Sequence, residues 1–455
     1  MSEQSERLYD AITLVGEDLI ERSQAAPAKK RRRWYRWAGP VAAVLVIAVL
    51  FGVFSGRGGV AAYAIAEAEY PTETAKFEMI EMNRYSGALD GFLAASIPEF
   101  LSGAGSENRV YSPLNVYMAL SMLAEVSDGN TRKQILDLLG SPDIATQREL
   151  AKKLWYSNYW TGERGECVLA NSLWLNQDVE FVKRTMETLA ADYYASSYRG
   201  EMGSAGFDRA LQGWLNEQTG GLLKEQADGV SMPADTVMAI ASTVFFKGTW
   251  SSKFDPEATG ADVFHAPDGE LTCDFMHGGK IGVYYWGEQF TAAQLYFSNL
   301  RSMFFILPDE GVSPDALLAD AEFLSFLSGD RAGWENQKVL MIDFTIPKFD
   351  VLSDIDLLPG LAALGVTDAL DRFVSDFSPM TTDVLEIRVS QAKHTARVSV
   401  DEEGCVAVAY TVIGVGGGSM PPEERVEFVL DRPFLFAITG PDSLPLFTGI
   451  VNRPV

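Results

Sequence analysis

The sequence predicts an α+β domain built on a large sheet, because helical patterns come first along the chain and strand patterns come later. The clearest helix begins at Ser112, a good N-cap residue, with Pro113 in its first turn. Further helices are expected over 131–139, closed by Gly140, and over 181–194 and 207–218. Runs of β-branched and aromatic residues predict strands at 236–246, 282–286, 295–307, 339–346 and 386–400, with a turn at 267–269.

The composition excludes some classes of function. The chain has 455 residues and a formal net charge of -25. A nucleic-acid binder needs a basic face to neutralise phosphates, so this charge argues against a nucleic-acid partner. The three cysteines, Cys167, Cys273 and Cys405, are an odd number and too few for a disulfide framework. The fold must therefore rest on its hydrophobic core.

The N-terminal region carries the pattern of a membrane anchor. Six basic residues lie between positions 29 and 36, directly before an uncharged apolar run at 38–55. At ~1.5 Å per residue this run covers roughly 27 Å, enough to cross a bilayer core. The positive-inside rule then places 1–37 in the cytoplasm, 56–74 as a spacer and 75–455 as an extracytoplasmic domain. A cleaved signal peptide is the alternative, but its positive region would be shorter. We expect a single-pass protein of the cell membrane.

Catalytic and metal-binding patterns are missing. The only histidines are His265, His277 and His394, and none lies beside a nucleophile-elbow sequence or has metal-ligand spacing to another His or Cys. Ser390 and Lys393 match a Ser-x-x-Lys pattern, which keeps a Ser-Lys hydrolase as a minor alternative, although its companion motifs are absent. We therefore expect no enzyme activity, no metal and no cofactor.

One uncharged segment stands out near the C-terminus. After Glu402 and Glu403 no charge appears from Gly404 to Pro422, and the segment alternates like a strand before it ends in a glycine run. An ordinary surface loop would be polar and rich in turn residues. The plain alternative is a sheet strand followed by a glycine-rich turn.

The order of several motifs resembles the serpin family over nearly all of 75–455, and the chain is identified as a membrane-anchored serpin of bacterial type. Each motif is modest, but the shared order is specific. The motifs are Asn108 to Leu114, Asp128 to Thr131, Thr243 to Trp250, Phe254 to Pro256, Ile346 to Phe349, His394 to Gly404, Asp431 to Phe436 and Leu446 to Gly449.

The resemblance implies a serpin fold, with helices around a large central sheet, further smaller sheets and an exposed reactive-centre loop at 402–422. It implies irreversible suicide inhibition of serine proteases, with cysteine proteases as a second class: the loop is cut and inserts into the central sheet. The family's spacing places the scissile bond at Gly418-Ser419, which favours elastase-like or subtilisin-like proteases with small or undemanding primary pockets, inhibited by a monomer. The resemblance further implies these roles: hinge residues Glu402, Glu403, Gly404, Cys405, Ala407 and Ala409, and sheet-opening (shutter and breach) residues Ser112, His394 and Trp250.

The chain also departs from the family's usual pattern. Cys405 replaces a threonine or serine, and Val408 and Tyr410 are larger than the usual alanines. Asn115 stands where serine is common, and Ser242 stands where asparagine is usual. A serpin fold that serves only as a binding module is therefore the alternative to an inhibitor.

Overall fold

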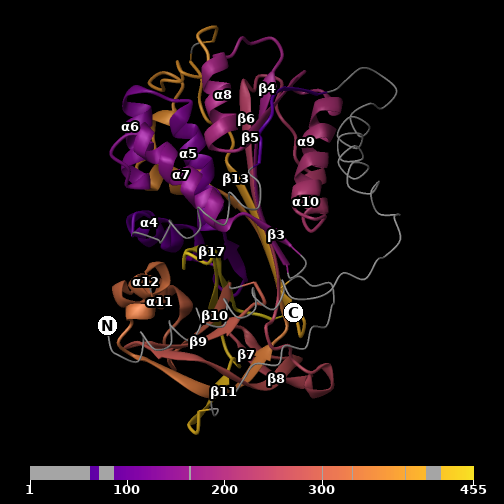
Figure 1. The fold of residues 1–455 in the computed structure, drawn as a ribbon, viewed down its shortest axis with the longest axis vertical. Helices are drawn as coiled ribbons and strands as arrows, with labels where there is room; N and C mark the ends of the chain where they lie inside the picture. The colour runs from indigo at the N-terminus through magenta and orange to yellow at the C-terminus, as the bar shows by residue number, and fades with distance from the viewer. Residues whose placement is uncertain are drawn as a thin grey trace, which may run out of the picture. The chain divides into compact units, whose positions relative to one another are not determined.

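The computed structural model describes residues 62–70, 87–162, 165–299, 301–329, 331–384, 386–405 and 422–454. From residue 62 onward the chain forms two sheets, and most of the helices lie around the sheet that contains β4, β5 and β6 (Figure 1). The predicted α+β class is confirmed.

The first sheet has eight strands in the order β1-β5-β4-β6-β14-β13-β12, with β3 paired to β4. The bounds of its strands are β1 Tyr63–Ala66, β3 Trp160–Gly162, β4 Gly165–Asn176, β5 Ala195–Gly200, β6 Met238–Thr249, β12 Phe349–Asp356, β13 Lys393–Val400 and β14 Gly404–Cys405. Strand β14 lies between β6 and β13 and pairs with both. Since it has only two residues, it fills only one end of the space between its neighbours.

The second sheet has nine strands in the order β15-β11-β8-β9-β10-β16-β17-β2, with β7 paired to β8. Their bounds are β2 Arg109–Tyr111, β7 Gly260–Ala266, β8 Gly269–Trp286, β9 Phe290–Tyr296, β10 Ser302–Pro308, β11 Gln337–Pro347, β15 Arg425–Val429, β16 Phe434–Thr439 and β17 Pro445–Val451.

The helices are mostly short. Their bounds are α4 Asp90–Leu101, α5 Pro113–Glu125, α6 Gly129–Leu139, α7 Ile144–Asn158, α8 Lys183–Asp192, α9 Ala205–Gln218, α10 Lys224–Asp228, α11 Pro314–Leu318, α12 Ala321–Ser328 and α13 Leu358–Ala363. Helix α5 packs against β6, β17, α6 and α7, and eleven of its thirteen residues are buried. A helix that is apolar on nearly every side has to lie inside the protein in this way.

Local signals explain where the predicted helices begin and end. The Asp128 carboxylate accepts the Gly129 N–H at the start of α6, and Gly140 ends this helix with a left-handed φ of 71°. Ser204 accepts the Phe207 N–H at the start of α9.

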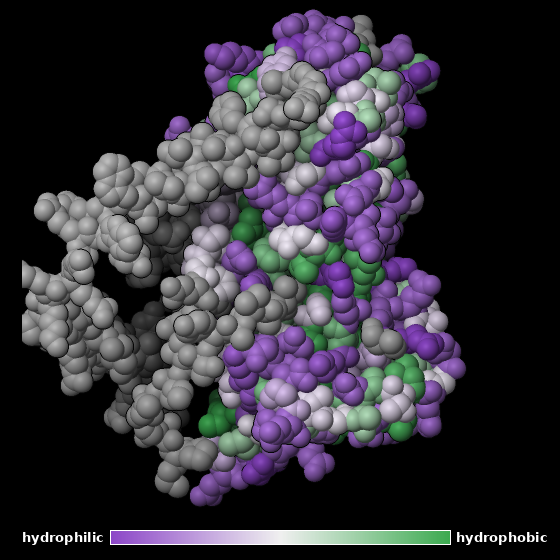
Figure 2. Space-filling model, turned by 90° about the vertical axis from the view of Figure 1, so that its right-hand side faces the viewer, coloured by the Kyte–Doolittle hydropathy of each residue, from purple (hydrophilic) through white to green (hydrophobic). Residues whose placement is uncertain are grey.

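Hydrophilic residues dominate the face shown in Figure 2, with hydrophobic ones interspersed.

Some sequence predictions differ from the structure. The single strand predicted at 295–307 is two antiparallel strands, β9 and β10, joined by a short turn. The strand predicted at 386–400 begins only at Lys393. Strand β1, which pairs antiparallel with β5, lies in the range that we expected to be a spacer, 56–74. The proposed boundary of the domain at residue 75 remains a prediction.

The structure corrects the predicted localisation. In the described residues, no helix is both long and apolar enough to cross a membrane. The longest, α7, has 15 residues and carries Arg148, Glu149, Lys152 and Lys153, and at ~1.5 Å per residue it covers only about 22 Å. We therefore correct the prediction of a single-pass cell-membrane protein, which these residues do not support. The predicted anchor at 38–55 lies outside the described residues.

Candidate functional site

The start of the predicted reactive loop already lies inside the first sheet. Gly404 pairs with Thr249 of β6, and Cys405 pairs with Gly248 of β6 and with Val400 of β13. The Cys405 side chain is 2% exposed, and burial raises the pKa of its thiol far above the ordinary value. The predicted hinge residues Gly404 and Cys405 therefore form the first step of a strand between β6 and β13.

Replacement of Gly404 by any other residue would displace the hinge. Its φ is 153°, and a Cβ built on it would lie 2.1 Å from the Gly248 carbonyl oxygen. Only glycine combines this backbone conformation with such a close approach to the neighbouring strand. The backbone geometry thus gives a physical reason for glycine at this predicted hinge position.

Two lysines hold the glutamates that precede the hinge glycine. Lys348 lies 3.1 Å from the Glu402 carboxylate, and the Thr259 hydroxyl donates to the same carboxylate at 2.9 Å. Burial alone would raise the pKa of Glu402, but hydrogen bonds from its own backbone, Lys348 and Thr259 outweigh burial and lower it. Lys253 forms an ion pair with Glu403. These contacts fix the loop at its point of entry into the sheet.

Trp250 also contacts the point where the loop enters the first sheet. Its indole N–H donates to the Asp401 carbonyl at 2.9 Å, and its backbone N–H donates to the Glu403 carbonyl at 3.0 Å. The indole is 2% exposed and stacks on Phe297, with ring centroids 4.6 Å apart. Trp250 therefore contacts the hinge directly, in addition to packing in the core.

Beyond Cys405 the space between β6 and β13 is not filled by any described strand. In the described residues β6 and β13 have no direct pairing with each other. We call this space the slot. A cavity of about 20 Å³ lies there, lined by 244–246 of β6, 395–397 of β13, Phe447 of β17 and the segment 219–223 after α9. The cavity is smaller than a strand, so the slot must widen before a strand can enter.

Helix α5 contacts both strands that border the slot. The Ser112 N–H donates to Nε2 of His394 on β13 at 3.0 Å, and Asn115 Nδ2 donates to the Ser242 hydroxyl on β6 at 3.4 Å. Ser112 lies at the N-cap position as predicted, but its hydroxyl donates to the Leu446 carbonyl at 2.6 Å instead of capping the helix. The structure thus brings together around the start of α5 four residues that the sequence singled out: Ser112, Asn115, Ser242 and His394.

His394 is buried and neutral at ordinary pH. It is 4% exposed, and burial lowers its pKa from 6.5 to about 4. The Tyr111 ring packs edge-on against the imidazole at a centroid distance of 5.4 Å. Because Nε2 accepts the Ser112 N–H, a proton on that nitrogen would break this contact.

Four of the predicted site residues are not placed by the structure. Ala407, Ala409, Gly418 and Ser419 lie outside the described residues, so their roles stay predictions. The sequence did not reveal that Lys253, Thr259 and Lys348 bind the carboxylates of the hinge glutamates.

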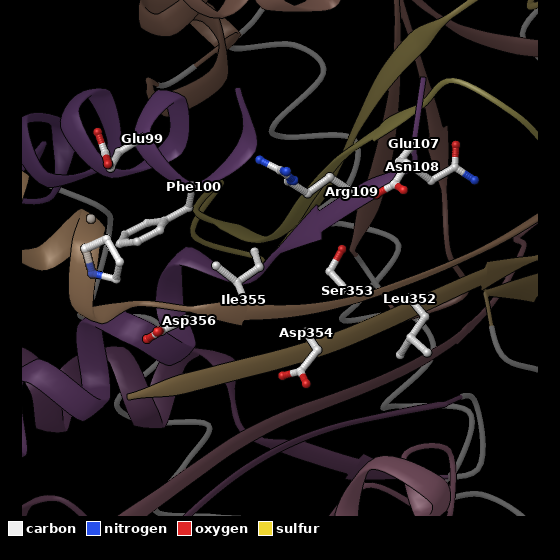
Figure 3. A pocket seen from close by; sticks show the side chains of 12 residues that line it. Glu99, Phe100, Glu107, Asn108, Arg109, Leu352, Ser353, Asp354, Ile355 and Asp356 are labelled. Atoms are coloured by element: carbon white, nitrogen blue, oxygen red, sulfur yellow. The ribbon is translucent and has the colours of Figure 1, made fainter. Parts of the chain in front are cut away.

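A larger hollow, about 450 Å³, lies between α4, β2, β12 and α13 (Figure 3). Its charged lining is Glu99, Glu107, Arg109, Asp354 and Asp356. None of the predicted site residues lines it. Among the described residues, no cluster of His, Cys, Asp and Glu has the arrangement of a metal site.

The Ser-Lys hydrolase alternative gains no support from the fold. Ser390 and Lys393 are both exposed, and the chain here enters strand β13. The pattern would require the start of a helix.

Comparison with known proteins relates this chain to one family. A family model described as "Serpin (serine protease inhibitor)" matches residues 92–454. Serpin-Z2B of Triticum aestivum is 28% identical, over 76% of this chain and 90% of its own. Glia-derived nexin of Rattus norvegicus is 26% identical, over 76% of this chain and 88% of its own.

The solved structures agree with the serpin fold. The thermophilic serpin tengpin in its native state has a TM-score of 0.72 at 23% identity, covering 87% of this chain and 100% of that chain. The two named relatives are from a plant and a mammal, so the bacterial type stays a prediction. Because the family model matches most of the sequence, the chain belongs to the serpin family, whose members are typically protease inhibitors and not enzymes.

Proposed function

We propose that this serpin is a suicide-substrate inhibitor of serine proteases. The observation that carries the proposal is the position of Gly404 and Cys405, which already pair with β6 and β13 at the entrance of the slot. A loop that is cut beyond this point can continue into the slot without any change in its pairing register.

The register gives the extent of insertion. Cys405 pairs with Gly248 in an antiparallel ladder, so each later loop residue would pair with one residue nearer the start of β6. Ten residues separate Gly248 from Met238, where β6 begins, and ten residues beyond Cys405 is Val415. The proposed scissile residue Gly418 would then pass just beyond the end of β6. Thirteen residues at ~3.4 Å carry it about 44 Å from the hinge.

Side-chain size supports insertion. In this register Ala407 and Ala409 would face the same side as Cys405, opposite Phe246 and Val244, where only small side chains fit a packed core. Tyr410 would fall on the other face, where the segment after α9 covers β6. Movement of this covering segment is therefore part of the proposed insertion.

The energy is sufficient to act on a bound protease. About ten inserted residues that each gain ~1 kcal/mol net from ladder hydrogen bonds release on the order of 10 kcal/mol. A protease domain is itself stabilised by about 5–15 kcal/mol. In serpins, insertion of the loop releases stored strain.

We propose separate roles for the residues around the slot. Trp250 and the lysines bound to Glu402 and Glu403 keep the hinge at the entrance, while Ser112 and His394 hold β13 to α5. The scissile bond is Gly418-Ser419, and a glycine before the cut suits elastase-like and subtilisin-like proteases. Cysteine proteases are a second target class, and the inhibitor acts as a monomer.

The test uses the full chain mixed in turn with subtilisin, elastase, chymotrypsin and trypsin. The expected result is a covalent complex that survives boiling in SDS, with cleavage mapped at Gly418. Cleavage of the loop without any complex, and without a rise in thermal stability, would contradict inhibition and favour the alternative of a serpin fold used as a binding module.

A further inference from the structure

Strand β12 is the last strand of the first sheet, and one of its two sides is open. It pairs with β13 along its whole length, and no other described strand pairs with it. The Leu357 N–H donates to the Ala392 carbonyl at 2.7 Å in the same register. Because antiparallel bonding alternates, the odd-numbered residues of β12 bond to β13. The even-numbered residues direct their N–H and C=O groups away from the sheet, where no described residue offers them a backbone partner.

The hollow of about 450 Å³ runs along this open side of β12 (Figure 3). Five consecutive residues of the strand, 352–356, line it. Side chains of a strand alternate between the two faces of its sheet, and in Figure 3 Ser353 and Ile355 point to one side while Leu352 and Asp354 point to the other. A hollow that reaches both sets must lie beside the strand, along its backbone. Its volume is in the range of ligand pockets, about 300–1,000 Å³.

The hollow carries an excess of negative charge. Four exposed carboxylates and one guanidinium line it, those of Glu99, Glu107, Asp354, Asp356 and Arg109. The guanidinium donates to the Ser102 carbonyl at 2.6 Å, and in the described part of the chain none of the four carboxylates forms an ion pair. Asp350, on the same strand but outside the hollow, is bonded to Arg397 at 2.6 Å. The carboxylates of the hollow are therefore free to bind a positively charged group.

The open side of β12 is already shaped to accept a strand. Ser353 is 8% exposed and accepts the Val110 N–H of β2 at 2.8 Å, which fixes β12 from the inner face of the sheet. Pairing with β13 holds the rest of the strand extended. An incoming chain thus meets a backbone that needs no rearrangement, which lowers the cost of binding.

We propose that the open side of β12 binds an extended basic peptide, which joins the first sheet as an added strand. The free backbone groups call for an extended chain. Asp354 and Asp356 call for positive side chains on the solvent face of the sheet, and Leu352, which is 42% exposed, offers contact to an apolar one.

The register defines the peptide. In an antiparallel arrangement Lys or Arg lies opposite Asp356 and Asp354, and an apolar residue lies opposite Leu352, at alternate positions of the peptide. Five residues at ~3.4 Å cover about 17 Å. The site shares no lining residue with the slot, so it goes beyond the proposed inhibition and does not depend on it.

The first experiment titrates the full chain by calorimetry with a capped peptide of sequence Lys-Thr-Lys-Thr-Leu. A second peptide carries methyl groups on the backbone nitrogens of both lysines, which removes two hydrogen-bond donors and keeps the charge. Its Kd should be at least tenfold higher, since each lost bond contributes ~1 kcal/mol. Equal affinity of the two peptides would overturn the addition of a strand.

The second experiment compares two double variants of the protein. Asp354→Asn with Asp356→Asn keeps an acceptor oxygen for the Thr395 hydroxyl and for the Leu358 N–H. The Kd of the unmethylated peptide should rise about fivefold, for two exposed ion pairs of ~0.5 kcal/mol each.

The matched control is Glu201→Gln with Asp235→Asn, which removes two exposed charges after β5 and before β6. It should leave the Kd unchanged. An equal loss of affinity in both double variants would mean that the peptide responds only to the net charge of the protein, and would overturn the site.

The third experiment measures hydrogen exchange of the fragment 350–357 by mass spectrometry, with the unmethylated peptide at ten times its Kd. The amides of Leu352, Asp354 and Asp356 should exchange about tenfold more slowly, because about a tenth of the protein stays unbound. Binding without this protection would place the peptide elsewhere and overturn the proposal. Protection that rises with protein concentration in the absence of peptide would assign the open side to a second copy of the chain, and would overturn it as well.

Discussion

His394 gives this protein a built-in sensitivity to acid. The perturbation is a drop in pH, which protonates an imidazole that is buried and accepts the Ser112 N–H at 3.0 Å. The cause of its lowered pKa is burial, which disfavours the charged form. The packed Tyr111 ring supplies no opposite charge to offset that cost.

The magnitude follows from the shift in pKa. In the unfolded chain the imidazole has its ordinary pKa of 6.5, and in the folded protein its pKa is about 4. Between these values the unfolded state binds a proton that the folded state does not, so stability falls as the pH falls through this window. Above pH 6.5 the neutral His394 contributes its full share of the folding stability. Below about pH 4 that share is lost, and further acidification removes no more stability through this group. A shift of ~2.5 units at ~1.36 kcal/mol per unit gives about 3.4 kcal/mol.

Thermal unfolding at neutral pH and at about pH 4 measures this loss. For a folded unit of about 390 residues, the loss corresponds to a drop of about 4 °C in Tm. The variant His394→Gln keeps a carbonyl acceptor for the Ser112 N–H but cannot titrate, so its Tm should fall by about 4 °C less than that of the original chain. His265→Gln is the control, because the His265 side chain is 54% exposed. Equal acid sensitivity in His394→Gln and the original chain would refute the reasoning.

Three further predictions concern the hinge and the loop. Gly404→Ala should displace the hinge from the sheet, because the new Cβ would collide with β6. The Cys405 thiol should then react with a disulfide reagent at least tenfold faster. The control Gly91→Ala, with open space around its Cβ, should leave this rate unchanged. Trp250→Phe keeps an aromatic ring but removes the indole hydrogen bond to the hinge, so the same thiol reaction should accelerate about fivefold, for a bond of ~1 kcal/mol. Gly418→Arg should transfer complex formation from elastase to trypsin, as judged on SDS gels; an unchanged protease preference would displace the proposed scissile bond.

Local signals made part of the fold predictable. Helices α6 and α9 carry both an apolar period and end signals, such as Gly140 after α6, and they were placed within a few residues. The run at 295–307 misled the prediction because the polar residues Ser298, Asn299 and Arg301, which separate β9 from β10, were read as part of one strand. Strand β1 carries no pattern that separates it from a linker, since its place depends on pairing with β5, far along the chain.

The sequence pointed to site residues only through local motifs. Gly404 and Cys405 were singled out because they lie in a distinct uncharged stretch, and their hinge role stays a prediction. The partners of the hinge glutamates were missed, because Lys253 lies 150 residues from Glu403 and nothing in the sequence links the two positions. The contact between Asn115 and Ser242 spans 127 residues, so the sequence showed two separate departures and the structure showed one pair.

Strand β1 has a practical consequence for work with this protein. Residues 63–66 cover the outer edge of β5, and Tyr70 then stacks on Trp155 with ring planes 2° apart. A fragment that begins at residue 75, where the sequence patterns suggest a boundary, would bare the backbone N–H and C=O groups of β5. Such an open edge invites pairing with another polypeptide and, at high concentration, aggregation. An expression fragment should therefore begin before Tyr63.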